Sequence, residues 1–462
     1  MVRLLFFIAI SLYLISNIYS HSIIEILLSL AAFLAVVWSI ATVGKIVLTF
    51  GILFLAAGFL MLYSSGTSWG EYIFAFGPMM NLLTLFALIP ILALPIKLGG
   101  YANDVEGVIR KKVKSKDQLY MVSSGTSFFL SSFMNLAALP MTYYSIRPSL
   151  NSFPIQDKER FMSRSITHGF AMPVLWTPVT PIVGVVIEMT GVSYTGVITY
   201  LVPLSIVGLL LDWFMAKLHI RRNNGSVNKE EAETKQQISA TLEVSQEKSH
   251  ARLLHIILAI LLLNIVVMIT EYFFELSFIF TISLLVIPFS LAWAVLLKKP
   301  KNFFEGLKGH FSTHLLKMKD QFFLFLSAGF FISAINMSGM DQSINKVIES
   351  LVNSIGIQFV LIILPFIPLL FAFLGLHPAV TFVLVVEALN PDVLGISHLL
   401  LALMMLGSAV PAFLMGPYNA TIGVMSNIVE KPPFQISNWN VSFCAVYFVL
   451  LLTALQIGHV LI

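Results

Sequence analysis

The chain has 462 residues, of which 58% are apolar and only 11% are charged, and its net charge is +4. A soluble domain is close to half apolar and a quarter charged, so this composition excludes a soluble globular protein and a disordered one. The mean hydropathy of +0.90 supports the same conclusion. A single cysteine, Cys444, excludes a disulfide scaffold, and the small net charge argues against nucleic acid as a partner. The sequence therefore predicts an all-α, polytopic membrane protein.

Apolar runs along the chain predict the membrane-spanning helices, each of which needs about 20 residues. Two apolar segments, 118–146 and 357–389, have lengths that fit neither one span nor two. The hydrophilic stretch 217–252 has the polarity of a linker, so we expect one membrane half at 1–216 and another at 253–462. The predicted spans are 4–19, 22–43, 46–64, 73–97, 167–190, 194–216, 253–271, 276–297, 321–338, 397–427 and 439–461.

Lys and Arg in short loops indicate the cytoplasmic side. Basic clusters at 97–116 and 147–164 flank segment 118–146. Both ends of that segment are therefore expected inside, which predicts a re-entrant hairpin of two half-helices. Segment 357–389 lies between nearly uncharged stretches and is expected to enter from the outer face. The predicted topology places the N-terminus in the cytoplasm and the C-terminus outside the cell membrane, and it leaves Lys346 as the only Lys or Arg outside.

The first 21 residues allow a second interpretation. Arg3, a short apolar run and the segment 18–20 (Ile-Tyr-Ser) have the order of a secretory signal with its cleavage region. Cleavage would require the rest of the topology to start outside, so an uncleaved first span is the simpler interpretation.

The two halves of the chain show the same features in the same order but with opposite orientation. Each has spans, an amphipathic stretch (340–355 in the second half), a hairpin, a proline-interrupted span and a final span. Pro178 and Pro417 each stand six residues before a glycine. Proline removes a backbone hydrogen bond, and groups freed at membrane depth need protein, water or a ligand as partners. Interrupted helices at matching positions of inverted repeats mark binding sites in secondary transporters.

In this architecture the chain resembles the ion transporter superfamily, and within it the divalent anion:sodium symporters and the citrate- and arsenite-type permeases. The segment 131–135 (Ser-Ser-Phe-Met-Asn) is similar to the serine and asparagine motif at a hairpin tip of those families. The second tip, around His377 and Pro378, has no asparagine and departs from their pattern. The resemblance implies transport of a small anion, with an elevator-like motion of a hairpin-bearing domain against a scaffold.

Candidate binding residues lie at the two hairpin tips and in the two interrupted spans. Hydroxyl and amide groups supply neutral ligands for sodium, or donors for a carboxylate, without a buried charge. A histidine can donate to an anion or take up a coupling proton. For any single serine, close helix packing is the simpler interpretation. The candidate ligands are Ser131, Ser132, Asn135, Thr177, Thr180, His377, Thr381, Asn419 and Thr421, and the expected helix breaks are at Pro178, Pro378 and Pro417.

Charged residues give less information about the substrate. His168 and Asp212 lie near the ends of predicted spans, and we expect both to be interfacial. No Lys or Arg lies deep within a predicted span, so an anion would be held by the N-termini of half-helices and by side-chain donors. A cation would find few buried carboxylates. Residue charge alone leaves the sign of the substrate open, and the resemblance favours an anion.

The leading interpretation is a secondary active transporter of a small, anionic solute, coupled to Na⁺ or H⁺ and without a bound cofactor or metal. A cation/proton antiporter or an arsenite-type exporter on the same scaffold is the first alternative. A membrane-embedded enzyme or a structural membrane subunit is an alternative from another class. An enzyme is not expected, because the only large loop is the charged linker. The expected partners are the solute and the lipid bilayer, and a homodimer stays open.

Overall fold

The computed structural model describes residues 2–100, 113, 115–150, 153–223, 248–274 and 276–461, and every regular element within these ranges is helical. Ten helices in this part of the chain are long and apolar enough to cross a membrane. The prediction of an all-α polytopic membrane protein is thereby confirmed.

The number of long apolar helices differs from the predicted number of spans for three reasons. The helix at the first expected span, 4–19, is Val2–Ser16, which is too short to count as a span. The expected span 167–190 consists of short helical pieces, so it is not one long helix. The first part of the predicted outer hairpin, 357–374, is a nearly continuous helix and is long enough to count as a span. Residues 357–374 therefore have the length and hydropathy of a complete span.

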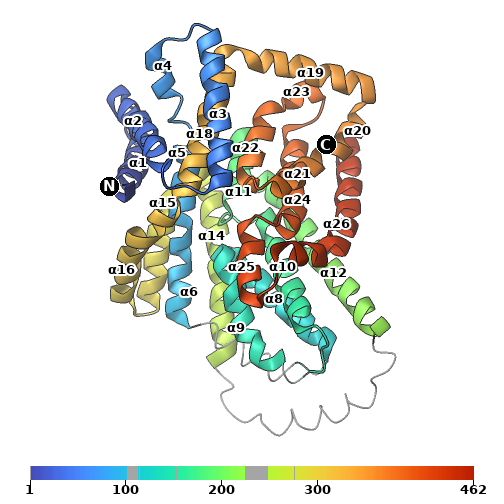
Figure 1. The fold of residues 1–462 in the computed structure, drawn as a ribbon. Coiled ribbons are helices and arrows are strands. Elements are labelled where there is room, and N and C mark those ends of the chain that lie inside the picture. Colours follow the sequence, from blue (N-terminus) through green and yellow to red (C-terminus); the bar gives the residue numbers. More distant parts are fainter. Residues whose placement is uncertain are drawn as a thin grey trace.

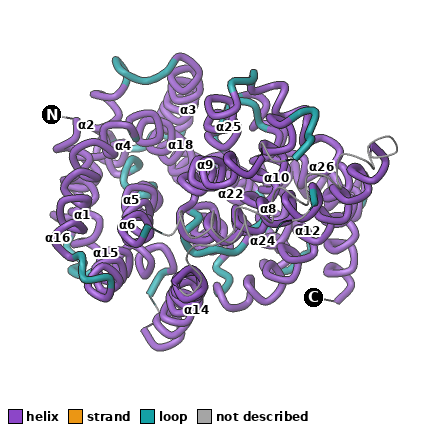
Figure 2. The backbone as a smooth tube through the Cα atoms, turned by 90° about the horizontal axis from the view of Figure 1, so that it is seen from below, coloured by secondary structure: helices purple, strands orange, loops and turns teal. Residues whose placement is uncertain are grey.

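The helices form two lobes that lie side by side in both views (Figures 1 and 2). The first lobe consists of α1 (Val2–Ser16), α2 (Ser22–Ser39), α3 (Lys45–Ser64), α4 (Trp69–Phe74), α5 (Met80–Leu88), η1 (Ile89–Leu92), α6 (Ala93–Gly99), α15 (Phe278–Leu296), α16 (Pro300–Gly309), the π-helical turn η4 (His310–His314), α17 (Leu315–Lys317) and α18 (Lys319–Ser338). The second lobe consists of α8 (Lys116–Met134), η2 (Asn135–Ala137), α9 (Ala138–Leu150), α10 (Lys158–Ala171), η3 (Pro173–Leu175), α11 (Pro181–Thr190), α12 (Tyr194–Asn223), α20 (Ile357–Ile363), η5 (Leu364–Phe366), α21 (Ile367–Leu374), α22 (Pro378–Ala388), α23 (Pro391–Leu394), α24 (His398–Met415), α25 (Ala420–Val429) and α26 (Pro433–Leu461).

Two further helices connect the lobes. α14 (Lys248–Phe274) contacts α15 of the first lobe and α12 of the second. α19 (Met340–Ile355) coincides with the amphipathic stretch 340–355 and crosses one end of the molecule from α18 to α20 (Figure 1). Each half of the chain thus supplies its early helices to the first lobe and its later helices to the second. The two lobes do not coincide with the two halves, 1–216 and 253–462.

Close packing within the first lobe depends on small residues. α3 and α18 lie against each other along their length. A Cβ atom built on Gly51 would lie 2.2 Å from the ring of Phe323, and one built on Gly58 would lie 2.8 Å from the ring of Phe330. Glycine therefore gives each phenylalanine ring the space to reach the neighbouring backbone, a device typical of membrane helices.

Helices extend into both ends of the predicted linker 217–252. α12 continues to Asn223 and α14 already begins at Lys248, while residues 224–247 lie outside the described part of the chain. Most of the basic cluster 97–116 also lies outside it.

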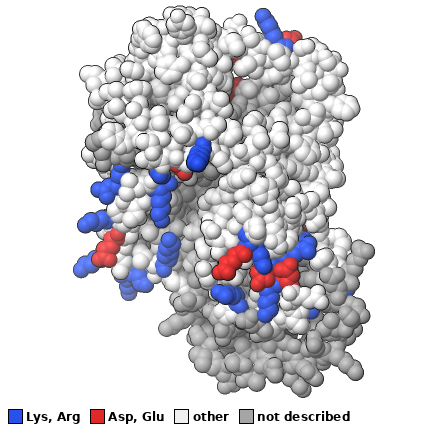
Figure 3. All heavy atoms as spheres, viewed as in Figure 1, with Lys and Arg blue, Asp and Glu red and all other residues white. Residues whose placement is uncertain are grey.

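Lys and Arg gather over one end of the molecule. In Figure 3 the blue atoms lie mainly on the lower half of the face shown. α6, which carries Lys97 in its last turn, α8, which begins at Lys116, and α16, which carries Lys308, all lie towards this lower end in Figure 1. We call it the basic end.

Candidate functional site

The first candidate tip is the turn between α8 and α9. The two helices contact each other, so segment 118–146 folds back on itself. Asn135, at the turn, has a φ of 48°, which few residues other than glycine adopt. Its side chain is partly exposed and has no hydrogen-bond partner among the described residues. The hydroxyls of Ser131 and Ser132 both donate to the carbonyl of Phe128 within α8. Both hydroxyl oxygens keep lone pairs that can accept, and the Asn135 amide keeps its donors and its acceptor.

The first helix break lies directly beside this tip. η3 ends at Leu175, α11 begins at Pro181, and Pro178 lies in the interruption. The hydroxyl of Thr177 donates to the carbonyl of Ser132 at 2.7 Å, which joins the break to the end of α8. Thr180 is buried and precedes α11 without capping it through its side chain.

Two side chains of α12 donate hydrogen bonds to carbonyl groups at the first break. The hydroxyl of Tyr194 donates to the carbonyl of Trp176 at 2.8 Å, and the hydroxyl of Ser205 donates to the carbonyl of Met172 at 2.9 Å. The two donors, Tyr194 and Ser205, are buried, and so are Trp176 and Met172. The broken backbone is therefore held by side chains of the helix that follows α11, as burial in a membrane protein demands.

Side chains also donate to the backbone carbonyl groups at the second helix break. α24 ends at Met415, α25 begins at Ala420, and Pro417 lies between them. The carbonyl groups of residues 412–415 all accept hydrogen bonds from side chains. Asn419 donates to the first two at 2.9 Å, Asn440 to the third at 2.7 Å and Ser437 to the fourth at 2.6 Å. Ser437 and Asn440 belong to α26, which follows α25 as α12 follows α11.

The second candidate tip differs from the first because it faces the other lobe. His377 caps α22, whose first residue is Pro378, by accepting a hydrogen bond from the backbone N–H of Ala379. Its ring lies 5.8 Å from that of Phe86 in α5 and 5.9 Å from that of Phe325 in α18. The second tip is thus part of the contact between the lobes.

Each hairpin also contacts the half-helix that follows the break of the other half. The turn η2 and helix α9 contact α25, and α22 contacts α11. Thr421 on α25 and Thr381 on α22 are both buried, and neither hydroxyl has a hydrogen-bond partner within the described residues. The structure therefore groups the first tip with both breaks, whereas His377 lies against aromatic rings of the first lobe.

His168 and Asp212, which we expected at the membrane interface, are buried in the second lobe with exposed fractions of 0% and 1%. The reason is helix length. α10 begins at Lys158, so His168 lies in its second half, and α12 continues to Asn223, so Asp212 lies well inside it. Polar residues in these helices are covered by other helices rather than by lipid, and a search for apolar runs does not detect them.

The two residues form the centre of a buried polar cluster. Nδ1 of His168 lies 2.6 Å from Oδ1 of Asp212, and the hydroxyl of Tyr120 donates to the same oxygen at 2.8 Å. Nε2 of His168 lies 3.0 Å from Oδ1 of Asn440. The imidazole also stacks on the ring of Phe443, with 4.3 Å between the ring centroids. We call His168, Asp212, Tyr120 and Asn440 the buried cluster.

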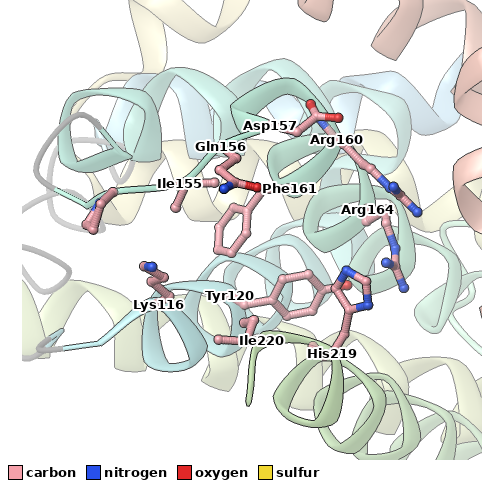
Figure 4. Close-up of a pocket in the computed structure, with 12 residues that line it drawn as sticks. Lys116, Tyr120, Ile155, Gln156, Asp157, Arg160, Phe161, Arg164, His219 and Ile220 are labelled. Atoms are coloured by element: carbon pink, nitrogen blue, oxygen red, sulfur yellow. The ribbon is translucent and has the colours of Figure 1, made fainter. Parts of the chain in front are cut away.

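A pocket of about 250 Å³ lies beside the buried cluster (Figure 4). Tyr120 belongs to both, since its ring lines the pocket and its hydroxyl contacts Asp212. Arg164 lines the pocket although only 8% of it is exposed, and the Nε atoms of Arg160 and Arg164 have no hydrogen-bond partner in the described part of the chain. The lining residues are Lys116, Tyr120, Pro154, Ile155, Gln156, Asp157, Arg160, Phe161, Arg164, Ala216, His219 and Ile220.

Comparison with known proteins identifies the fold. No protein-family model and no curated protein sequence matches the chain. Among solved structures, the chain is similar to the YdaH transporter of Alcanivorax borkumensis, whose crystal structure is described as having an unusual topology. The match has a TM-score of 0.58 at 11% identity and covers 88% of this chain and 98% of that one. The chain thus has the fold of a transporter, and at this identity the likeness shows the fold alone.

Proposed function

We propose that this protein is a secondary active transporter that moves a small, anionic solute across the cell membrane by alternating access, coupled to Na⁺ or H⁺. The observation that carries the proposal is the pair of interrupted helices, at 176–180 and 416–419, each in the second lobe and each close to a hairpin. Interrupted helices with such neighbours form the binding sites of secondary transporters. The shared fold with YdaH supports transport rather than an enzymatic reaction.

Reciprocal contacts support an inverted repeat within the second lobe. α9 contacts α25, and its counterpart α22 contacts α11. α12 holds the first break through Ser205 and Tyr194, and its counterpart α26 holds the second through Ser437 and Asn440. On this proposal, 118–146 and 357–389 are re-entrant hairpins that enter from opposite faces.

The chemistry around the breaks favours an anion. α11 and α25 both begin at a break, so the positive ends of their helix dipoles point to the interrupted region. The free amide of Asn135 adds a side-chain donor from the first tip. The basic end, which we place in the cytoplasm, carries the pocket lined by Arg160 and Arg164 and would attract an anion from that side.

The two lobes supply the parts of an elevator-like motion. The second lobe carries both breaks and both hairpins and would move against the first. The contact of His377 with Phe86 and Phe325 lies on the surface between them. Aromatic rings there can slide past one another, but Asn336 of α18 donates to Glu387 of α22 at 2.7 Å, and the motion would break this hydrogen bond between the lobes.

The test is uptake into proteoliposomes from a panel of carboxylates and inorganic oxyanions, under a Na⁺ gradient, a H⁺ gradient or neither. We expect gradient-dependent uptake of at least one anion and its loss in Asn135→Ala. Asn135→Gly is the matched control for the backbone, because glycine keeps the positive φ and removes the amide. Both variants should lose uptake by at least about tenfold, the effect of about 1.4 kcal/mol.

Three outcomes would contradict the proposal in different ways. Uptake of cations alone, or exchange of cations for protons, would favour an antiporter on the same scaffold. Full uptake of the anion by Asn135→Gly would remove the first tip from the site. Copurification of the chain with a stable partner, together with no uptake of any panel member, would favour a structural subunit.

A further inference from the structure

We infer that His168 and Asp212 form a proton-binding site that controls the hydrogen bonds at the second helix break. The inference rests on the proposed function only in naming H⁺ as the coupled ion. It is carried by four buried side chains from four helices, which are Tyr120 on α8, His168 on α10, Asp212 on α12 and Asn440 on α26.

The geometry places a side-chain oxygen beside each nitrogen of the His168 ring. Nδ1 faces a carboxylate oxygen of Asp212 at 2.6 Å. Nε2 faces the amide of Asn440 at 3.0 Å. The orientation of that amide is fixed, because its nitrogen donates to the carbonyl of Leu414 at 2.7 Å and a carbonyl can only accept. Its oxygen therefore points to the histidine. Two acceptors around one imidazole are both satisfied when the ring is doubly protonated and Asp212 is ionised.

Titratable and charged groups lie near His168 and Asp212 on α8, α10 and α26. On α8 the hydroxyl of Tyr120 donates to Asp212. On α10 Arg164 precedes His168 by one helical turn, and its charge acts on Tyr120. On α26 the nearest titratable groups are Cys444 and Tyr447, both buried, and the hydroxyl of Tyr447 donates to the carbonyl of Gly407. Asp212 is the only carboxylate in contact with the histidine in the described part of the chain, and its second oxygen has no hydrogen-bond partner.

Loss of the proton would disturb the second break. If Nε2 gave up its proton, its lone pair would face the oxygen of Asn440. The amide would then turn to offer its nitrogen to the ring, and its oxygen would face the carbonyl of Leu414. That carbonyl, at the end of α24, would lose its side-chain donor. An unpaired carbonyl in a buried site is costly, so the protonated and deprotonated states favour different conformations of residues 412–419.

Tyr120 joins the buried cluster to the basic end. Its hydroxyl contacts Asp212, and its ring lines the pocket of Figure 4. When Nε2 of the His168 imidazolium loses its proton, one water molecule accepts it and becomes hydronium. The product is a neutral imidazole that keeps its proton on Nδ1, beside ionised Asp212.

A single-cysteine reporter tests the inference without a substrate. Cys444, the only cysteine, is replaced by alanine, and Tyr418 in the break, which is 52% exposed, by cysteine. The rate of maleimide labelling is measured from pH 5.5 to 8.5 and divided by the rate for glutathione at the same pH. We expect the normalised rate to rise about fivefold through one transition as pH rises, the equilibrium effect of one net hydrogen bond. His168→Gln in the same background should give a flat profile.

Asn440→Leu separates the proton site from its effect on the break. In this variant His168 should still bind a proton, seen in the ¹⁵N spectrum of histidine-labelled protein, while the labelling profile becomes flat. A flat profile in the reporter with His168 and Asn440 intact would overturn the inference, and so would an unchanged transition in His168→Gln. Because no substrate is used, an inactive transport assay leaves this result unaffected.

Discussion

At both helix breaks, side chains of the following helix donate hydrogen bonds to backbone carbonyl groups, but the tips beside the breaks differ. At the first break, Ser205 of α12 supplies a hydroxyl to a freed carbonyl, and at the second, Ser437 of α26 does so. The first tip is polar and is joined to its break by the hydrogen bond from Thr177 to Ser132. The second tip has His377 against aromatic rings of the other lobe. The repeat thus preserves how the backbone is held, while ligand chemistry and lobe contact are divided between the tips.

The largest expected difference in stability is between alanine variants of two glycines in the interrupted spans. A Cβ atom on Gly169 would lie 2.1 Å from the carbonyl oxygen of Ser124, which is backbone of α8. A Cβ atom on Gly407 would lie 2.3 Å from Leu451, whose side chain can turn away. We expect Gly169→Ala to lower the free energy of unfolding by about 3 kcal/mol and Gly407→Ala by about 1 kcal/mol. Thermal unfolding in detergent measures both, and equal losses would contradict the tighter packing of α8 on α10.

The next largest difference in stability is expected between variants of Asn419 and Asn135. Asn419 makes three hydrogen bonds, two to freed carbonyls and one from the backbone N–H of Ile422. Asn419→Ala should therefore cost about 2 kcal/mol of stability. Asn135 makes no side-chain hydrogen bond among the described residues, so Asn135→Gly should leave stability unchanged or slightly raised. The same thermal assay compares them, and a large loss in Asn135→Gly would give that residue a structural role.

Two threonines provide a smaller contrast. Thr177→Val removes the hydrogen bond to the carbonyl of Ser132 and should cost about 1 kcal/mol. Thr381 is buried with an unpaired hydroxyl, so Thr381→Val should be neutral or stabilising. If Thr381 binds the solute, uptake falls in that variant while its unfolding midpoint stays the same. A stability loss in Thr381→Val equal to that in Thr177→Val would show that the unpaired hydroxyl has a partner.

The smallest effect concerns a third interruption, η1 in the first lobe, where the donor is a histidine. Nε2 of His310 donates to the carbonyl of Ala87 just before η1. Burial lowers the pKa of His310, and burial with the nearby His310 and Lys317 lowers the pKa of His314 to about 4. Both rings are therefore neutral in the folded protein at a pH where the unfolded chain, with its ordinary pKa of 6.5, already binds protons.

Stability should consequently fall as pH drops from 6.5 towards 4 and stay level above 7. Unfolding midpoints measured across this range test the prediction, with His314→Gln as the comparison. The variant should show a shallower decrease. An equal decrease in both proteins would assign the acid sensitivity to other groups.

The sequence predicted the architecture well because composition and proline act locally. Long apolar runs require a membrane, and Pro178 and Pro417 remove backbone donors wherever the chain places them. The sequence did not predict the burial of His168 and Asp212. A span surrounded by other helices need not be apolar on all sides, so α10 carries Arg164 and His168 and still lies inside the second lobe.

One signal in the sequence pointed to the partners of the second break. Ser437 and Asn440 are three residues apart, which places a hydroxyl and an amide on one face of an otherwise apolar helix. Polar groups arranged in this way inside a membrane need acceptors, and the end of a broken helix provides them. Which break they serve depends on the packing of α26 against α24, which no local pattern specifies.

α19 has a mechanical consequence for any motion of the lobes. It is 16 residues long, about 24 Å at 1.5 Å per residue, and it joins the last helix of the first lobe to α20 of the second. Gly339 before it and Gly356 after it have φ angles of 73° and 82°, which favour glycine. A displaced second lobe would turn α19 as a rigid lever about these two pivots. The length of the lever then sets an upper limit to the stroke at this end of the molecule.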